Sequence, residues 1–219
     1  MSLSESLETT TMRRVYWRLI PLLFIGMFLN YLDRINIGFA ALRMNHDLAL
    51  TPSVFGFGAS VFFLGYMLLG VPSNLMLDRI GARVWIPVIL VFWGVVATLT
   101  AFVKGAASFD AVRFLLGVAE AGALPGFALY VTQWFPASYR ARAIAGYIIA
   151  GQAAAIFGSP LAAFLIAMTD RIFGLHGWQW MFIIEGLPTI LLGLAFLILL
   201  TERPADARWL APEQREWLQ

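Results

Sequence analysis

Five ionisable residues lie inside long apolar stretches, where water does not solvate a charge. They are Asp33, Arg34, Arg113, Glu120 and Glu185. Charged side chains inside a bilayer are costly and are functional candidates by default. An arginine grips a carboxylate through two parallel hydrogen bonds, and burial favours the neutral form of an acid, so that it can bind and release a proton. Arginines beside buried acids therefore predict a site where an anion and a proton are handled together.

The apolar stretches that carry these residues are long enough to cross a membrane. Hydrophobic residues make up 60% of the 219 residues and charged residues only 13%, against about a quarter charged in soluble domains. A spanning helix needs about 20 apolar residues, and the runs do not alternate as strands of a barrel would. We expect an all-α polytopic membrane protein, with spans near residues 16–40, 52–77, 84–103, 109–130, 143–167 and 181–200.

The distribution of basic residues predicts the orientation of the spans. Of the 15 lysines and arginines, only Arg43, Lys104 and Arg171 fall in the segments on the side opposite the N-terminus. Such a bias places the arginine-rich side in the cytoplasm. We therefore expect residues 1–15 to be a cytoplasmic tail, residues 201–219 to begin a cytoplasmic linker, and the protein to lie in the plasma (inner) membrane.

Arg34 and Arg113 are expected to reach similar depths from opposite directions. With a rise of about 1.5 Å per residue, Arg34 lies roughly 22 Å from the inner end of the first span and Arg113 roughly 6 Å from the outer end of the fourth. Glu120 lies two turns further along, on the same face as Arg113. We expect Arg34 and Arg113 to bind an anion and Asp33 or Glu120 to carry a proton, whose arrival frees an arginine.

A structural interpretation of the same charges stays open. Arg34 and Arg113 could extend to the membrane surface, and Asp33 with Arg34 could form a helix-end pair. Glu185 lies about one turn into the sixth span, just before Gly186 and Pro188, and we expect it to be structural.

Nearby polar side chains could complete a site for a hydroxylated ligand. Asn30, Tyr31 and Asn36 surround the Asp33–Arg34 pair, and Gln152 lies in the middle of the fifth span. For Asn30, Asn36 and Gln152, a polar contact between helices is the alternative role.

Small residues suggest where helices approach closely or bend. One stripe at four-residue spacing on the fifth span consists of Gly146, Ala150, Ala154, Gly158 and Ala162. Such stripes permit close helix contact, but the partner is not evident within this chain and could lie outside it. Gly122 and Gly126, beside Pro125, could loosen the fourth span.

Several motifs together resemble the major facilitator superfamily. The segment NLMLDRIGAR at residues 74–83 is similar to its G-x-L-x-D-R-x-G-R motif, with Asn74 in place of Gly and Ala82 inserted before Arg83; RFLLGVAEAGALPG begins at Arg113, as in the superfamily's R-x-x-x-G helix. Within the superfamily, the chain resembles the anion:cation symporter family, and its tartrate-transporter-like branch, on the segments NYLDRINIGFAA, VPSNL, WFPASYRARA, GSPLA and GWQWMFIIEGLP.

The resemblance implies roles for individual residues. Asp33 and Glu120 match proton-linked acids, Arg34 and Arg113 match ligands of the substrate carboxylate, and Tyr31 matches a tyrosine that lines the site. A cytoplasmic gate motif is matched by Asp78, Arg79 and Arg83, with Arg140 or Arg142 as the partner of Asp78.

The resemblance also implies an activity and an architecture. Members carry tartrate, sugar acids and similar carboxylates in symport with protons by alternating access, using two six-helix halves around a midplane site. This chain matches the N-terminal half, with its 3+3 inverted repeat, so the expected partners are a small organic anion, the proton, the bilayer and a C-terminal six-helix half.

Other functional classes find less support. The sequence has no cysteine, and His46 and His176 are far apart without clustered acids, so no catalytic or metal constellation is evident. No charge ring or carbonyl filter typical of a channel is evident either. We expect no cofactor, no metal and no nucleic-acid partner. A membrane scaffold or receptor that does not transport stays as the alternative.

Overall fold

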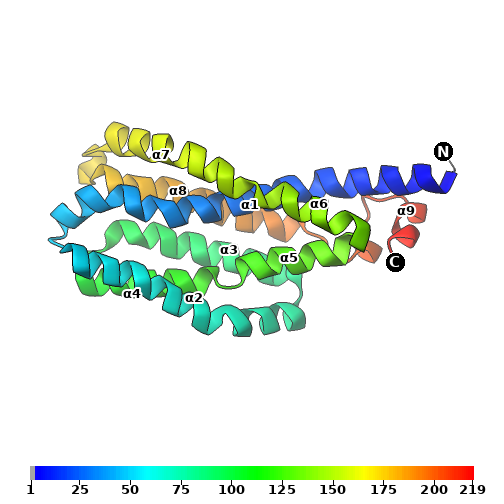
Figure 1. The fold of residues 1–219 in the computed structure, drawn as a ribbon, viewed down its shortest axis with the longest axis horizontal. Coiled ribbons are helices and arrows are strands. Elements are labelled where there is room, and N and C mark those ends of the chain that lie inside the picture. The colour runs from blue at the N-terminus through cyan, green and yellow to red at the C-terminus, as the bar shows by residue number, and fades with distance from the viewer. Residues whose placement is uncertain (1–2) are drawn as a thin grey trace.

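The computed structural model describes residues 3–219, and within this range the regular structure is entirely helical (Figure 1). Its elements are α1 (Leu3–Asp47), α2 (Pro52–Ile80), α3 (Ala82–Leu99), η1 (Thr100–Phe102), α4 (Ala106–Glu120), α5 (Ala123–Trp134), α6 (Ala137–Ile148), α7 (Ala150–Thr169), η2 (Ile172–Gly174), α8 (Gly177–Leu199), η3 (Pro204–Asp206) and α9 (Pro212–Trp217). Six helical segments are long and apolar enough to cross a membrane. The predicted all-α bundle of six spans is therefore confirmed.

The spans run side by side along the long axis of the molecule, and both termini lie at the same end (Figure 1). We call this end the terminal end and the opposite one the far end. The charge count predicts that the terminal end is cytoplasmic.

The first helix begins well before the predicted span. Residues 3–15, which the sequence suggested were a separate tail, continue without a break into α1. Met12 and Val15 of this extension share one helix face with Leu19 of the span, and all three are buried. An apolar face that is covered stabilises a helix beyond the membrane, which explains why α1 is longer than a bilayer requires.

Two of the spans are each built from two helices. The fourth span consists of α4 and α5, separated at Ala121 and Gly122, and the fifth consists of α6 and α7, separated at Ile149. A Cβ atom on Gly122 would collide with Ser73 of α2 and Ile89 of α3, so the chain needs glycine here. Pro125, in the first turn of α5, lacks the N–H that a continuous helix would use. The break follows Glu120 directly.

The stripe of small residues on α6 and α7 faces α1, so its partner lies within this chain. Ala150, Ala154 and Ala162 are fully buried. A Cβ atom on Gly158 would lie 2.6 Å from the side chain of Ile35 on α1. Small residues thus allow α7 to approach α1 closely.

Residues 201–219 are docked on the terminal end of the bundle and are not a loose linker. The Tyr130 hydroxyl donates to the carbonyl of Thr201 at 2.8 Å, and the Trp209 ring stacks on Trp134 with centroids 5.5 Å apart. Glu202 accepts hydrogen bonds from the first two backbone N–H groups of α3, at Ala82 (3.0 Å) and Arg83 (2.8 Å). These N–H groups have no partner within the helix, and a carboxylate there also complements the helix dipole.

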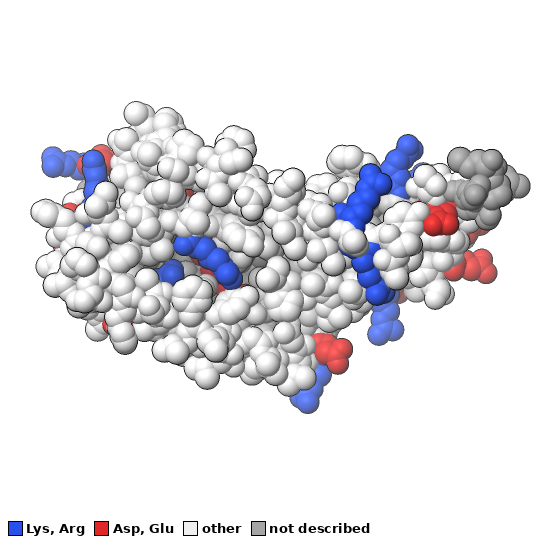
Figure 2. All heavy atoms as spheres, in the orientation of Figure 1, with Lys and Arg blue, Asp and Glu red and all other residues white. Residues whose placement is uncertain are grey.

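Charged side chains gather toward the two ends of the molecule and leave a belt of uncharged surface between them. Figure 2 shows one small group of blue and red atoms in a hollow of that belt. The exposed large apolar side chains of the bundle, such as Phe63, Met67 and Ile198, match a surface in contact with lipid. The molecule is thus a multi-pass membrane protein whose belt carries few charges.

The close contact of α2 with α4 gives a test of the packing. A Cβ atom on Gly65 would collide with the backbone of α4 at Phe114, whereas one on Gly70 of the same helix would meet nothing within 4 Å. We expect Gly65→Ala to lower the free energy of unfolding by about 1–3 kcal/mol because the helices must move apart. The matched Gly70→Ala should be neutral or stabilising. Thermal unfolding in detergent checks both, and equal stability of the two variants would contradict the tight packing.

Candidate functional site

An ion pair between α1 and α4 forms the centre of the site. The Nε atom of Arg34 lies 3.1 Å from Oε2 of Glu120, whose side chain is fully buried. Asn30, one turn before Arg34 on α1, donates its amide to the same oxygen at 2.8 Å. The break after Glu120 leaves this residue at the last position of α4. Because Asn30 and Arg34 are four residues apart, they share one face of α1 and hold Glu120 together.

The second arginine joins this site from α4. The Arg113 guanidinium lies 4.8 Å from the centre of the Phe62 ring of α2, and that of Arg34 lies 5.5 Å from the same ring. Arg34 also lies 4.9 Å from the Tyr66 ring. Cations over aromatic faces are attracted to the ring electrons. The rings of α2 thus gather two like charges in one place.

Asp33 is held on the side of α1 that faces α3. Its Oδ2 atom accepts a hydrogen bond from the indole N–H of Trp93 at 2.7 Å, and both residues are buried. Asp33 and Glu120 both attract Arg113 electrostatically. The structure therefore brings together the four charged residues Asp33, Arg34, Arg113 and Glu120.

Several polar atoms of this cluster are left without a partner. In the described part of the chain, Oε1 of Glu120 and Nε of Arg113 are buried and make no hydrogen bond. The Arg34 side chain keeps 30% of its surface exposed, so the cluster has an accessible edge. Buried polar groups are costly unless they are paired. The Glu120 oxygen can still accept a hydrogen bond or a proton, and the Arg113 N–H can still donate one.

Tyr31 and Gln152 lie beside the charged cluster rather than in its hydrogen-bond network. The ring of Tyr31 is partly buried and packs against the backbone of α7 at Gly151. Gln152, the next residue, is exposed. Neither is hydrogen bonded to Arg34 or Glu120 among the interactions of residues 6–219. Their predicted contact with substrate stays a prediction.

Asn36 occupies a different position from the one expected for a ligand. Its side chain is completely buried and donates its amide to Glu185 of α8. Asn36 and Glu185 thus form a polar contact between α1 and α8, the alternative role considered for Asn36. Glu185, expected to be structural, joins the two helices through this bond.

The predicted gate residues Asp78, Arg79 and Arg83 lie at the end of α2 and the start of α3, at the terminal end, where α6 with Arg140 and Arg142 also begins (Figure 1). Arg140 donates to the carbonyl oxygens of Phe135 (2.9 Å) and Thr132 (3.1 Å), and Arg142 lies over the Tyr16 ring. No ion pair joins Asp78 to either arginine within residues 6–219. Arg140 is instead engaged by carbonyls at the C-terminal end of α5, and its pairing with Asp78 stays a prediction.

Trp93, Phe62 and Tyr66 were missed from the sequence. Each lies in an apolar span, where an aromatic residue has no special signal. The spacing of residues along one helix does not show which residues of a neighbouring helix lie opposite them. Only the packing of α2 and α3 against α1 and α4 reveals their contacts with the charges.

The comparison with known proteins defines the class to which this bundle belongs. Residues 23–219 match the model of the Major Facilitator Superfamily, and the chain belongs to that family. The resemblance drawn from the sequence motifs is thereby confirmed. The fold agrees: the crystal structure of an inward-facing bacterial homologue of the human lysosomal transporter Spinster has a TM-score of 0.75 over 87% of this chain and 44% of its own, at 21% identity.

Curated relatives narrow the comparison further. A protein of Agrobacterium vitis, provisionally named a tartrate transporter, is 48% identical over 99% of this chain and 50% of its own length. A quinolone resistance transporter of Acinetobacter baumannii is 42% identical over 96% of this chain and 48% of its own length. The chain spans about half the length of both relatives and corresponds to an N-terminal half.

The contact of Asn36 with Glu185 predicts different effects for two substitutions. Glu185→Ala removes the partner of a buried amide and should cost about 1–3 kcal/mol of stability. Glu185→Gln keeps a carbonyl that accepts from Asn36 and should cost far less. Thermal unfolding in detergent distinguishes them. Equal destabilisation by both variants would show that the carboxylate itself is required.

Proposed function

We propose that the protein that contains this chain is a secondary active transporter, which carries small organic anions such as tartrate or sugar acids in symport with protons by alternating access. The observation that carries the proposal is the ion pair of Arg34 with the buried Glu120, at the edge where Arg34 is partly exposed. Arg113 lies beside it, over the same aromatic ring.

The two arginines supply the means to bind a carboxylate. The Arg34 Nε atom donates to Glu120, and no hydrogen bond from its two Nη atoms to a carboxylate is found in the described chain. Those atoms can donate a pair of hydrogen bonds to one carboxylate. Arg113 adds a second positive charge, which makes a dicarboxylate or a hydroxylated acid a suitable ligand.

The buried acid supplies coupling to the proton. When Glu120 is ionised, its charge competes with the substrate for Arg34. When Glu120 is protonated, Arg34 loses its counter-charge and attracts an anion instead. Substrate and proton therefore favour the same state of the site, which is the thermodynamic requirement for symport.

The names of the two relatives support organic anions as the substrate class, and they name different compounds within it. One relative is named for tartrate, a dicarboxylate, and the other for quinolones, which also carry a carboxylate. A carboxylate is thus the group common to both. Alternating access requires a second half that rocks against this one, so transport is proposed for the full-length protein.

Uptake into liposomes tests substrate binding. With full-length protein, we expect labelled tartrate or a sugar acid to accumulate faster under an inward proton gradient. Arg113→Ala should raise KM at least about tenfold because a charge-assisted hydrogen bond to substrate is lost. Arg43→Ala, an exposed arginine at the far end, is the matched control and should behave as wild type. Uptake of a labelled quinolone is measured in the same liposomes as a second candidate substrate.

Proton coupling is tested by Glu120→Gln. The amide keeps the shape of a protonated acid but does not titrate. We expect counterflow of the anion to continue while accumulation driven by the proton gradient is lost. If the variant still accumulates substrate like wild type, Glu120 is not the coupling group.

The alternative, a scaffold or receptor that does not transport, predicts no counterflow of any organic anion. That result, with the protein folded and inserted, would overturn the proposed function.

A further inference from the structure

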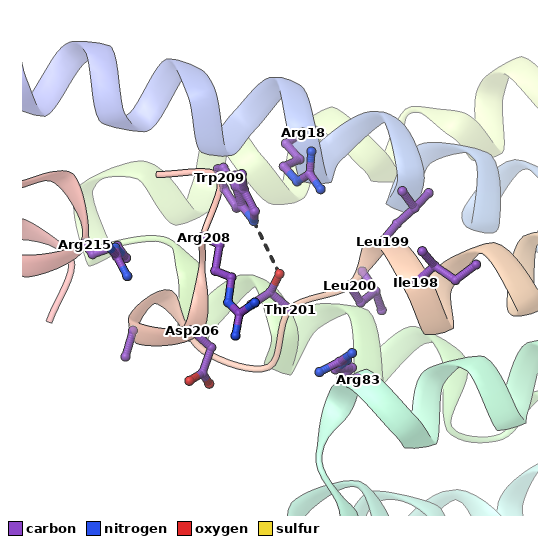
Figure 3. Close-up of a pocket in the computed structure, with 11 residues that line it drawn as sticks. Arg18, Arg83, Ile198, Leu199, Leu200, Thr201, Asp206, Arg208, Trp209 and Arg215 are labelled. Atoms are coloured by element: carbon purple, nitrogen blue, oxygen red, sulfur yellow. Dashed lines mark hydrogen bonds between the residues drawn. The ribbon is translucent and has the colours of Figure 1, made fainter. Parts of the chain in front are cut away.

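A second basic site lies at the terminal end, away from the charged cluster in the membrane. A cavity of about 660 Å³ opens there between the end of α8, the start of α3, α1 and residues 201–215. Four arginines line it: Arg18, Arg83, Arg208 and Arg215. In Figure 3 the side chains of Arg18, Arg83 and Arg208 lie around Thr201, and Arg215 lies further along on α9. We call it the arginine cavity.

The positive charge of the arginine cavity is only partly offset by the acidic residues of the described chain. None of the four arginines forms an ion pair within residues 6–219, and Asp206 is the single acidic residue among those that line the cavity. Arg18 stacks over the Trp209 ring at 4.9 Å, which leaves its N–H groups free to donate. The Nε atom of Arg215 is buried without a partner. The lining of the cavity therefore suits an anion with several acceptor oxygens.

An apolar surface leads directly into the cavity. Leu194, Leu197 and Ile198 of α8, spaced to share one helix face, are 48%, 43% and 82% exposed. Ile198 and Leu199 also line the cavity, next to Thr201 where the helix has ended. A small soluble anion would use the arginines but leave this stripe uncovered. A phospholipid fits both surfaces, with its phosphate among the guanidiniums and its chains along α8.

We propose that the arginine cavity binds the headgroup of an anionic phospholipid, whose acyl chains lie along Leu194, Leu197 and Ile198. Basic pockets between transmembrane helices, at the membrane surface, are suited to such headgroups. Arginine is the preferred ligand because its planar fork matches phosphate oxygens. This assignment depends on the membrane location of the bundle and not on the proposed transport.

Native mass spectrometry of the full-length protein tests the assignment. The protein is mixed with phosphatidylglycerol and phosphatidylcholine of identical chains, and retained lipid is measured. We expect phosphatidylglycerol to be retained preferentially. The double substitution Arg18→Gln, Arg208→Gln should weaken its binding about fivefold for each arginine removed, with phosphatidylcholine unaffected. If the double variant folds poorly, Arg208→Gln alone is measured instead. This residue is exposed, and its substitution should weaken phosphatidylglycerol binding about fivefold.

A matched control removes the same charge at the same end but outside the cavity. Arg13→Gln, Arg203→Gln changes two exposed arginines and should retain phosphatidylglycerol like wild type. An equal loss of phosphatidylglycerol in both double variants would show that diffuse surface charge, and not the arginine cavity, retains the lipid. Equal retention of the two lipids would also overturn it. If an equal concentration of glycerol phosphate displaced phosphatidylglycerol, the cavity would be a site for a soluble anion, and the proposed lipid binding would be wrong.

Discussion

The cost of placing charge in a region without water governs how the first and fourth spans meet. Removing one partner of a buried ion pair typically costs about 3–5 kcal/mol because the other charge is left uncompensated. Glu120 is fully enclosed, so α4 must present it to a cation, and Arg34 of α1 is that cation. The same requirement explains the positions of Asn30, Phe62 and Tyr66, because each of them contacts a member of the ion pair. The helices are arranged around the charges that they must satisfy.

This requirement explains why the bundle needs close packing elsewhere. Arg34 reaches Glu120 only if the helix axes are near enough, and small residues at the contacts allow that approach. Gly65 of α2 lies against the α4 backbone, and Gly186 of α8 lies against α3. A bundle packed backbone to backbone is stiff, so motion is more easily accommodated between bundles than within one.

The sequence predicted the number and type of the spans well, because helix length and hydropathy are local properties. It also identified the charged residues of the cluster, since ionisable groups stand out in an apolar segment. Gly122 beside Pro125 suggested where the fourth span loosens. The sequence did not predict the break at Ile149, which depends on contacts with other helices, nor the contact made by Trp93, which is one aromatic residue among many. The contacts of Arg140 with carbonyls at the end of α5 were not predicted, because a motif match does not show which backbone groups lie nearby. The position of Asn36 likewise depends on which face of α8 approaches α1.

The docked segment from Thr201 to Leu218 affects how a longer chain could move. It is fastened by Glu202 to the start of α3, by Trp209 to Trp134 and by Gln214 to Arg14 of α1. Most of this segment is therefore packed on the six-helix bundle and does not act as a flexible linker. In relatives that continue for about as much chain again, the flexible tether between halves has to be supplied by later residues. Glu202 also accepts from the backbone N–H of Arg83, so a pull on the segment after Leu218 would be transmitted first to the loop between α2 and α3.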